Sequence, residues 1–210
     1  SAFNPDAIKN TRFYKGSFPA EYGGRLSSVV DVRMNDGNRQ EYHGNISVGL
    51  LSARANLEGP IVKDRSSFNV SVRRTWLDLI TGTALAIINK NSDTKESFGY
   101  HFFDINAKVN HSFSERSRAY LSFYMGQDAF RQGSKEKHED SDDMFLWRWG
   151  NLIGSAGWNY VFGQKLFGNL MVGYSRFRSH IRQEAKGYEI EGNRAERQSI
   201  KRDSRYKSEM

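Results

Sequence analysis

The chain has 210 residues and a formal net charge of +7, from 31 Lys and Arg against 24 Asp and Glu. The absence of Cys excludes disulfide scaffolds, Cys-based zinc sites, iron–sulfur clusters and thiol catalysis. An aromatic content of 13% argues against intrinsic disorder. No apolar run approaches the roughly 20 residues that a membrane-spanning helix needs.

Residues 1–38 differ in character from the rest of the chain, because they hold two of its three prolines and several turn signals. Alternation of apolar and polar residues predicts two short strands, Ile8–Lys15 and Leu26–Met34. A loop rich in Gly and Pro lies between them at 16–24, and 35–38 is a strong turn signal. We therefore expect a small β-rich unit at this end.

From Tyr42 onward, longer runs alternate apolar and polar residues, which predicts six antiparallel strands. In the first run the apolar residues change parity near Leu50 and Leu51, which we interpret as a β-bulge. The predicted strands are about 42–57, 67–76, 100–113, 118–130, 147–162 and 166–181.

The links between these runs alternate in length. They are short after the first, third and fifth runs and long at 77–99, about 127–146 and from 183 onward. The runs also exceed the ~5–6 residues of a usual soluble strand, and aromatic residues gather near their ends. Long strands, short turns on one side and long loops on the other are typical of transmembrane β-barrels. A soluble β-sandwich also alternates apolar and polar residues and remains the alternative.

The first long link contains a helical pattern. Leu77, Ile80, Ala84 and Ile87 recur at helical spacing, so we expect a short helix over 77–88 that packs at the rim of the sheet or acts as a lid. The fold class predicted from these patterns is all-β, with antiparallel strands of a partial transmembrane β-barrel of about six strands. Six strands do not close such a barrel, so this interpretation implies a piece of a longer protein.

Several stretches resemble the TonB-dependent outer-membrane receptors, and most closely those of the Bacteroidetes kind. Residues 3–16 and 18–32, with the Lys15-Gly16 turn and the Tyr22-Gly23-Gly24 loop, look like the end of the plug domain of that family. Residues 57–61 with 67–76 are similar to its first barrel hairpin, and 102–109 and 121–128 fit its early strands.

The resemblance implies a division at residue 38, with the C-terminal part of a plug domain at 1–38 and the N-terminal part of a β-barrel at 39–210. The barrel of that family has 22 strands, and the energy-coupling box and most of the plug would lie upstream. It also implies a location in the bacterial outer membrane and the energised uptake of an iron chelate, glycan, cobalamin or peptide, without chemistry on it.

The partners implied by the resemblance are outer-membrane lipid and lipopolysaccharide, the TonB energy-coupling complex, the ligand itself and a surface lipoprotein. No cofactor is expected. No catalytic motif such as G-x-S-x-G, H-E-x-x-H or a P-loop occurs, which indicates that the protein is not an enzyme.

The resemblance also suggests which residues seat the plug in the barrel, namely Tyr22, Gly23, Gly24, Arg25 and Arg33. Paired glycines fit a tight loop, and the two arginines would pair with barrel carboxylates. The alternative for this loop is a solvated β-turn.

Trp147 and Trp149 share one face of a predicted strand, opposite Leu152. If that face lines the lumen, the two rings are suited to stack on a sugar or an aromatic ligand. The alternative is an aromatic girdle at the membrane interface.

Two charged stretches carry weaker hypotheses. His138 lies among acidic residues in the loop 131–143, but the spacing is not that of an EF-hand, and a solvated loop without metal is the expectation. The basic stretch 194–205 is interspersed with acids and lacks a nucleic-acid-binding motif, so we expect no nucleic acid partner.

A second hypothesis for function is a self-contained soluble β-sheet binding module, for example for carbohydrate. The two hypotheses differ in where the apolar faces point. The receptor predicts an apolar outer band and a polar lumen, whereas the module predicts an apolar interior between two sheets.

Overall fold

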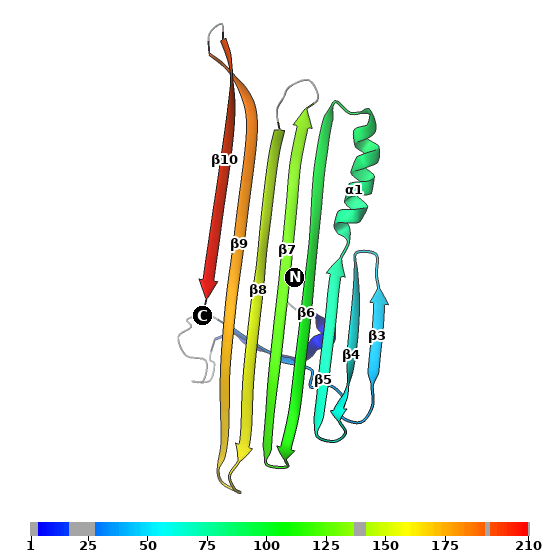
Figure 1. Ribbon diagram of the computed structural model, residues 1–210, viewed down its shortest axis with the longest axis vertical. Coiled ribbons are helices and arrows are strands. Elements are labelled where there is room, and N and C mark those ends of the chain that lie inside the picture. Colours follow the sequence, from blue (N-terminus) through cyan, green and yellow to red (C-terminus); the bar gives the residue numbers. More distant parts are fainter. Residues whose placement is uncertain (1–3, 17–27, 137–141, 192–193, 210) are drawn as a thin grey trace.

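The computed structural model describes residues 4–16, 28–136, 142–191 and 194–209, and the side chains of 136, 142, 185–191 and 194–209 are not described. Two antiparallel sheets contain nearly all of the regular structure, so the expected all-β, antiparallel fold is confirmed. In the large sheet every strand pairs with its neighbour in sequence, from β3 at one edge to β10 at the other (Figure 1).

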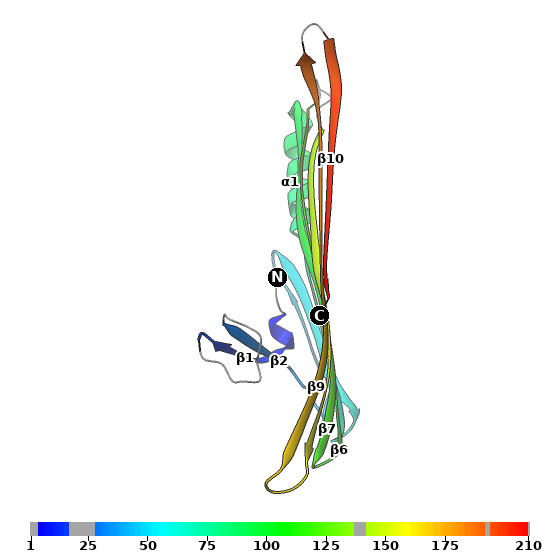
Figure 2. The same cartoon turned by 90° about the vertical axis from the view of Figure 1, so that its left-hand side faces the viewer.

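The small sheet is a hairpin formed near the N-terminus. A 3-10 turn, η1 (Pro5–Ala7), leads into β1 (Ile8–Tyr14), which pairs with β2 (Val29–Met34). Figure 2 shows this hairpin standing to one side of the large sheet.

The large sheet has eight strands, the first three of 6 to 11 residues and the last five of 16 to 25, and its edges do not meet. Short turns at 63–65, 115–116 and 162–166 join the strands at its lower end in Figure 1. The strands are β3 (His43–Val48), β4 (Ser52–Val62), β5 (Ser66–Thr75), β6 (Thr94–Ser114), β7 (Ser117–Glu136), β8 (Asp142–Val161), β9 (Phe167–Glu191) and β10 (Arg194–Glu209).

The run at 42–57 is a hairpin, and the prediction of one strand with a bulge is wrong. Val48 pairs with Ala53 and Ile46 with Ala55, so β3 and the start of β4 lie side by side. Each pair combines an even with an odd residue number, which is why the apolar parity changes across the turn. The backbone amide of Gly49 closes this turn by donating to the carbonyl of Ser52.

The upper parts of the long strands occupy most of the chain that was expected to form long loops. β7 continues to Glu136, β8 begins at Asp142, and β9 continues to Glu191. Apolar residues in these stretches, such as Phe130, Phe145 and Leu146, do not alternate regularly with polar ones, so periodicity does not mark the stretches as strands. Cross-strand pairing nevertheless continues through them without a break in register.

The expected helix is present as α1 (Leu77–Ile88), followed by the 3-10 turn η3 (Asn89–Asn91). Pairing between β5 and β6 ends at Arg74 and Phe103, and α1 runs beside the upper part of β6 beyond that point (Figure 1). The side-chain amide of Asn89 bonds both backbone groups of Glu96, and Thr81 Oγ1 donates to the carbonyl of Phe98 at 3.0 Å. These side chains satisfy strand groups that no neighbouring strand reaches.

Among the described residues, no helix combines the length and the apolar character needed to cross a membrane.

The two faces of the large sheet differ sharply in chemistry. On one, the polar face, Asn69 is fully buried and Asp104 is 2% exposed. On the other, the apolar face, Ile46 is 80% and Leu170 60% exposed. This is the reverse of a soluble sheet, in which apolar side chains are the buried ones. Cross-strand pairing puts polar residues in register on the first face: Asn45, Asn56, Ser71, Asn106, Tyr124.

Candidate functional site

The N-terminal hairpin docks on the polar face through the turn that follows β2. Lys108 of β6 donates to Asp36 Oδ1 at 2.6 Å and to the carbonyl of Met34 at 3.2 Å. Asn110 and Ser67 both donate to the carbonyl of Asp36. Neighbouring strands of the sheet therefore hold one turn of the N-terminal segment at several points.

Further polar contacts extend this docking site across the first strands of the sheet. Glu58 Oε2 accepts from the side-chain amides of Asn35 at 3.0 Å and Asn69 at 3.2 Å. Arg54 forms an ion pair with Asp6 at 3.1 Å. The contacts of Asn35 and Asp6 join the N-terminal segment to the polar face. The hydrogen bond from Asn69 supports them by holding the Glu58 side chain in place. We call this set of contacts the seat.

Asp36 is the electrostatic centre of the seat, because it also accepts from Lys9 of β1 at 2.9 Å. Burial raises the pKa of Asp36, but the hydrogen bonds and charges of Lys108 and Lys9 outweigh this effect and hold the pKa below its usual value. The carboxylate therefore stays ionised at neutral pH and binds two ammonium groups from different parts of the chain.

The next residue, Gly37, adopts a positive φ of 79°. A Cβ atom there would lie 2.2 Å from the carbonyl oxygen of Phe68 on β5. Only glycine combines this backbone conformation with so close an approach. The turn 35–38 is therefore fitted to the strand on which it rests.

The residues expected to seat the plug are placed only in part. Tyr22, Gly23, Gly24 and Arg25 lie outside the described residues. Arg33 lies in β2 and forms an ion pair of 3.5 Å with Asp31 of the same strand.

The contacts of the seat come from residues that the sequence analysis did not select: Asp6, Asn35, Asp36, Arg54, Glu58 and Lys108. Two signals for them were present in the sequence. The turn at 35–38 was recognised, and polar residues from Asp104 to Asn110 alternate with apolar ones.

A second group on the polar face is aromatic and lies above the seat. Trp149 pairs in register with Asp128 and Trp147 with Phe130, so both tryptophans lie on the same face as Asp104 and Asn106. The rings of Trp147 and Trp149 have centroids 4.3 Å apart. Tyr100 stacks on Trp149 at 6.5 Å with an interplanar angle of 26°.

Charged groups are fixed directly beside these rings. Tyr100 donates its hydroxyl to Asp128 at 2.7 Å. Arg73 binds Asp104 at 2.6 Å through a guanidinium nitrogen, and its guanidinium lies 4.7 Å from the centroid of Phe102. Flat rings beside fixed hydrogen-bonding groups suit a ligand with both apolar and hydroxyl surfaces. We call Tyr100, Phe102, Trp147 and Trp149 the aromatic cluster.

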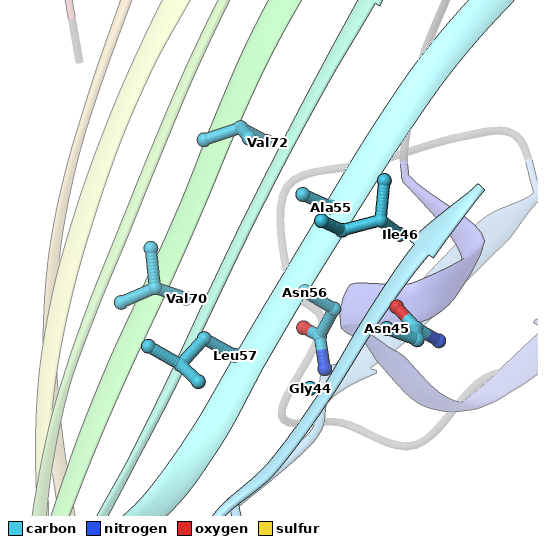
Figure 3. Close-up of a pocket in the computed structure, with 8 residues that line it drawn as sticks. All are labelled: Gly44, Asn45, Ile46, Ala55, Asn56, Leu57, Val70 and Val72. Atoms are coloured by element: carbon cyan, nitrogen blue, oxygen red, sulfur yellow. The ribbon is translucent and has the colours of Figure 1, made fainter. Parts of the chain in front are cut away.

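A shallow hollow of about 520 Å³ lies on the opposite, apolar face. Figure 3 shows Leu57, Val70 and Val72 projecting into it from β4 and β5, with Ile46 from β3. The side chains that face this hollow carry no group suited to catalysis or to metal binding. Its surface is hydrocarbon, which suits contact with another apolar phase or surface.

Neither charged stretch yields a site within the part of it that the structure describes. No cluster of three or more potential metal ligands occurs among the described residues. Residues 137–141 of the acidic loop, His138 included, lie outside them. The basic stretch 194–205 belongs to β10, whose backbone pairs with β9.

No family model, curated protein or solved structure matched the chain.

Proposed function

We propose that the chain is the late plug and early barrel region of a TonB-dependent outer-membrane receptor, which takes up a specific ligand with energy from the inner membrane. One observation carries the proposal. The apolar face of the large sheet is exposed, whereas the polar face of β4 to β6 is covered by the N-terminal segment. In a bacterial outer-membrane barrel, hydrocarbon covers the first kind of face and a plug covers the second.

The extent of the apolar face supports a membrane setting. On β7 its apolar positions run from Ala119 to Met125, which is about 20 Å of strand at ~3.4 Å per residue. That approaches the ~25 Å apolar band of outer-membrane barrels. Aromatic rings of Trp158, Tyr160 and Phe162 follow one another at the lower end of β8, as expected where strands leave hydrocarbon.

The aromatic cluster supports a ligand site on the lumen side. It occupies the polar face above the seat, so a ligand bound there would lie between the plug and the outer ends of the strands. Trp147 and Trp149 would stack on its apolar surfaces, while Arg73 and Asp128 would bind polar groups. No bond of the ligand needs to be made or broken for such uptake.

The soluble binding module fits the two faces less well. It requires a second sheet or another layer packed on the apolar side chains. Among the described residues, the small sheet packs on the polar face, and Ile46, Leu121 and Val172 remain exposed.

The test is the size and location of the native protein. Antibodies against this chain would be used on fractionated source cells, with samples run both boiled and unboiled. A band several times larger than 24.1 kDa in the outer membrane, with mobility that changes on heating, is expected. A soluble band near 24 kDa would contradict the proposal and favour the binding module.

Ligand binding provides a second readout. Candidate iron chelates and oligosaccharides would be titrated against the purified full-length protein while tryptophan fluorescence is recorded. The ligand that binds is expected to lose about tenfold or more in affinity with Trp149→Ala. Trp158→Ala, on the opposite face, is the matched control and should leave the affinity unchanged.

A further inference from the structure

We propose that Arg148, Arg176, Arg178 and His180 form a binding site for the phosphate headgroup of a membrane lipid, whose acyl chains lie on the apolar face below. This proposal rests on the proposed function, because it places the apolar face in a membrane. We call these four residues the basic belt.

Strand register brings the basic belt together on the apolar face. Arg148 of β8 pairs with His180 of β9, Gly150 with Arg178, and Leu152 with Arg176. All four side chains line one shallow groove of about 680 Å³, which Gln127 of β7 also borders. Figure 1 shows β7, β8 and β9 side by side over this stretch.

The charges of the three arginines of the belt are available to a ligand. Arg148 and Arg178 are exposed, and Arg176 is partly exposed. Among the described side chains, no carboxylate lies within 4.0 Å of Arg148, Arg176 or Arg178. Arg182, further up the same face, differs in that Glu184 binds it at 2.5 Å.

Basic residues also occur at the paired positions of the next strand, β10. Lys207 and Arg205 of β10 stand opposite Arg178 and His180, and Glu209 stands opposite Arg176. The surplus of basic residues on β8 and β9 attracts an anion, and guanidinium groups match phosphate oxygens in a bidentate fork.

The position of the belt identifies the anion as part of a lipid. Directly below Arg176 on the same face lie Tyr174, Val172 and Leu170 of β9. Leu152, which pairs with Arg176, begins the corresponding apolar stretch of β8. A phosphate held by the belt would thus have its acyl chains beside exposed hydrocarbon.

The same strands carry no such charges on the other face. At the height of the belt, the alternate positions of β8 and β9 are Trp147, Trp149 and Ser179. The basic residues are therefore restricted to the face that contacts lipid. A ligand in the lumen would not meet them, whereas a headgroup at the membrane interface would.

The experiment uses the purified full-length protein in non-ionic detergent, with didecanoyl phosphatidic acid as the probe. Binding is measured by thermal unfolding and by lipid phosphorus retained after gel filtration. The triple variant Arg148→Gln/Arg176→Gln/Arg178→Gln is expected to bind phosphatidic acid about tenfold more weakly, because charge-assisted hydrogen bonds to phosphate are lost. Didecanoyl glycerol, which lacks the phosphate, should bind both proteins equally weakly.

A matched control removes the same charge at the other end of the sheet. Lys63→Gln/Arg65→Gln/Arg116→Gln changes exposed residues of the lower turns and should retain wild-type affinity. If the triple variant of the belt fails to fold, Arg178→Gln alone is used, with a loss of about threefold expected.

Three results would overturn the proposal: equal binding by wild type and belt variant, equal weakening in the control, or binding of inorganic phosphate or polyglutamate as tight as that of phosphatidic acid. These failures are distinct from failure of the proposed function. A protein that remains heat-modifiable in the outer membrane but does not bind the probe loses only the lipid site. A soluble native protein overturns both.

Discussion

Lys108 and Asp36 connect the two sheets of the protein, with Lys108 Nζ 2.6 Å from Asp36 Oδ1 although 72 residues separate them in the chain. The Lys108 side chain is 12% exposed, and its ammonium group also lies 5.1 Å from the centroid of Tyr120. A charge that is so little exposed is stable only with partners. The docked position of the N-terminal segment supplies them.

Replacing Lys108 by Met should loosen this docking while preserving the length and apolar part of the side chain. We expect a cost of about 1 kcal/mol, because Asp36 is 41% exposed and water screens the pair. The measurement is the rate of trypsin cleavage at Lys9, Arg12 and Lys15 in the full chain under native conditions, which should rise roughly fivefold.

Lys165→Met, in the exposed lower turn, serves as the control for that experiment and should leave the cleavage rate unchanged. In a double-mutant cycle, Asp36→Asn should add little to Lys108→Met, because both changes remove the same pair. Fully additive effects would show that Lys108 does not act through Asp36.

The lowered pKa of Asp36 predicts how docking depends on pH. The native pKa lies below the ordinary value of 3.8, so ionised Asp36 stabilises the docked state above pH 3.8. This stabilisation is lost as the pH falls through the lower, native pKa. Because the chain has no Cys, a fluorescent probe on Arg12→Cys reports the motion of the hairpin without interference.

The probe anisotropy should stay constant from about pH 7 to pH 5 and decrease below 3.8. Asp36→Asn should remove most of the pH dependence. A probe on Lys165→Cys reports any general acid effect. The same acid transition in wild type and Asp36→Asn would assign it to other carboxylates.

Gly37→Ala should destabilise the turn of the seat for two reasons. The backbone has φ of 79°, and the new Cβ would lie 2.2 Å from the Phe68 carbonyl oxygen. Left-handed strain and overpacking together predict a loss of about 2–4 kcal/mol. Urea unfolding of the full chain in vesicles, followed by tryptophan fluorescence, measures it. Gly163→Ala, which meets nothing within 4 Å, should be nearly neutral, and equal losses would contradict the steric argument.

The parts of the fold that the sequence predicted are those with a marked periodicity. Alternation located the middles of β5 to β9, and helical spacing located α1. At these positions one face of the strand or helix is apolar and the other polar. The spacing of apolar residues in the sequence therefore indicates the type of element and the face on which each side chain lies. The strong turn at 35–38 was recognised for a similar reason, since Asn, Asp and Gly favour turns by themselves.

The missed features depend on contacts between distant residues. The hairpin of β3 and β4 changes the parity of apolar residues just as a bulge would, so only the pairing of Val48 with Ala53 distinguishes the two. The upper halves of β7 and β8 lack a regular alternation of apolar and polar residues and are defined by their pairing with neighbouring strands. The seat joins Asp36 to Lys108, a pairing that local patterns do not contain.

Placing a charge on the apolar face should block membrane assembly under the proposed function. Leu170→Arg and Val72→Arg should each be destabilising, by about 2–4 kcal/mol at the middle of the bilayer and by less toward its edges, which Leu170 approaches because it pairs with Trp158. The amount of heat-modifiable protein in the outer membrane measures assembly. Ser175→Arg, at an alternate position on the other face of β9, is the matched control and should assemble better than Leu170→Arg. Similar defects in all three variants would indicate that the two faces do not differ in their surroundings.

The tryptophans offer a test of the two faces that needs no ligand. Trp158 lies on the same face as Ala119 and Leu170, whereas Trp149 lies on the opposite face beside Tyr100. Single-tryptophan versions of the full-length protein would be reconstituted in vesicles whose acyl chains are brominated near the headgroup. Bromine quenches only at short range, so fluorescence should fall strongly for Trp158 and little for Trp149. Acrylamide in the aqueous phase should have the opposite preference, because a water-filled lumen admits it to Trp149. Equal quenching of both by brominated lipid would place Trp149 at the membrane interface as part of a girdle and remove the aromatic cluster as a ligand site.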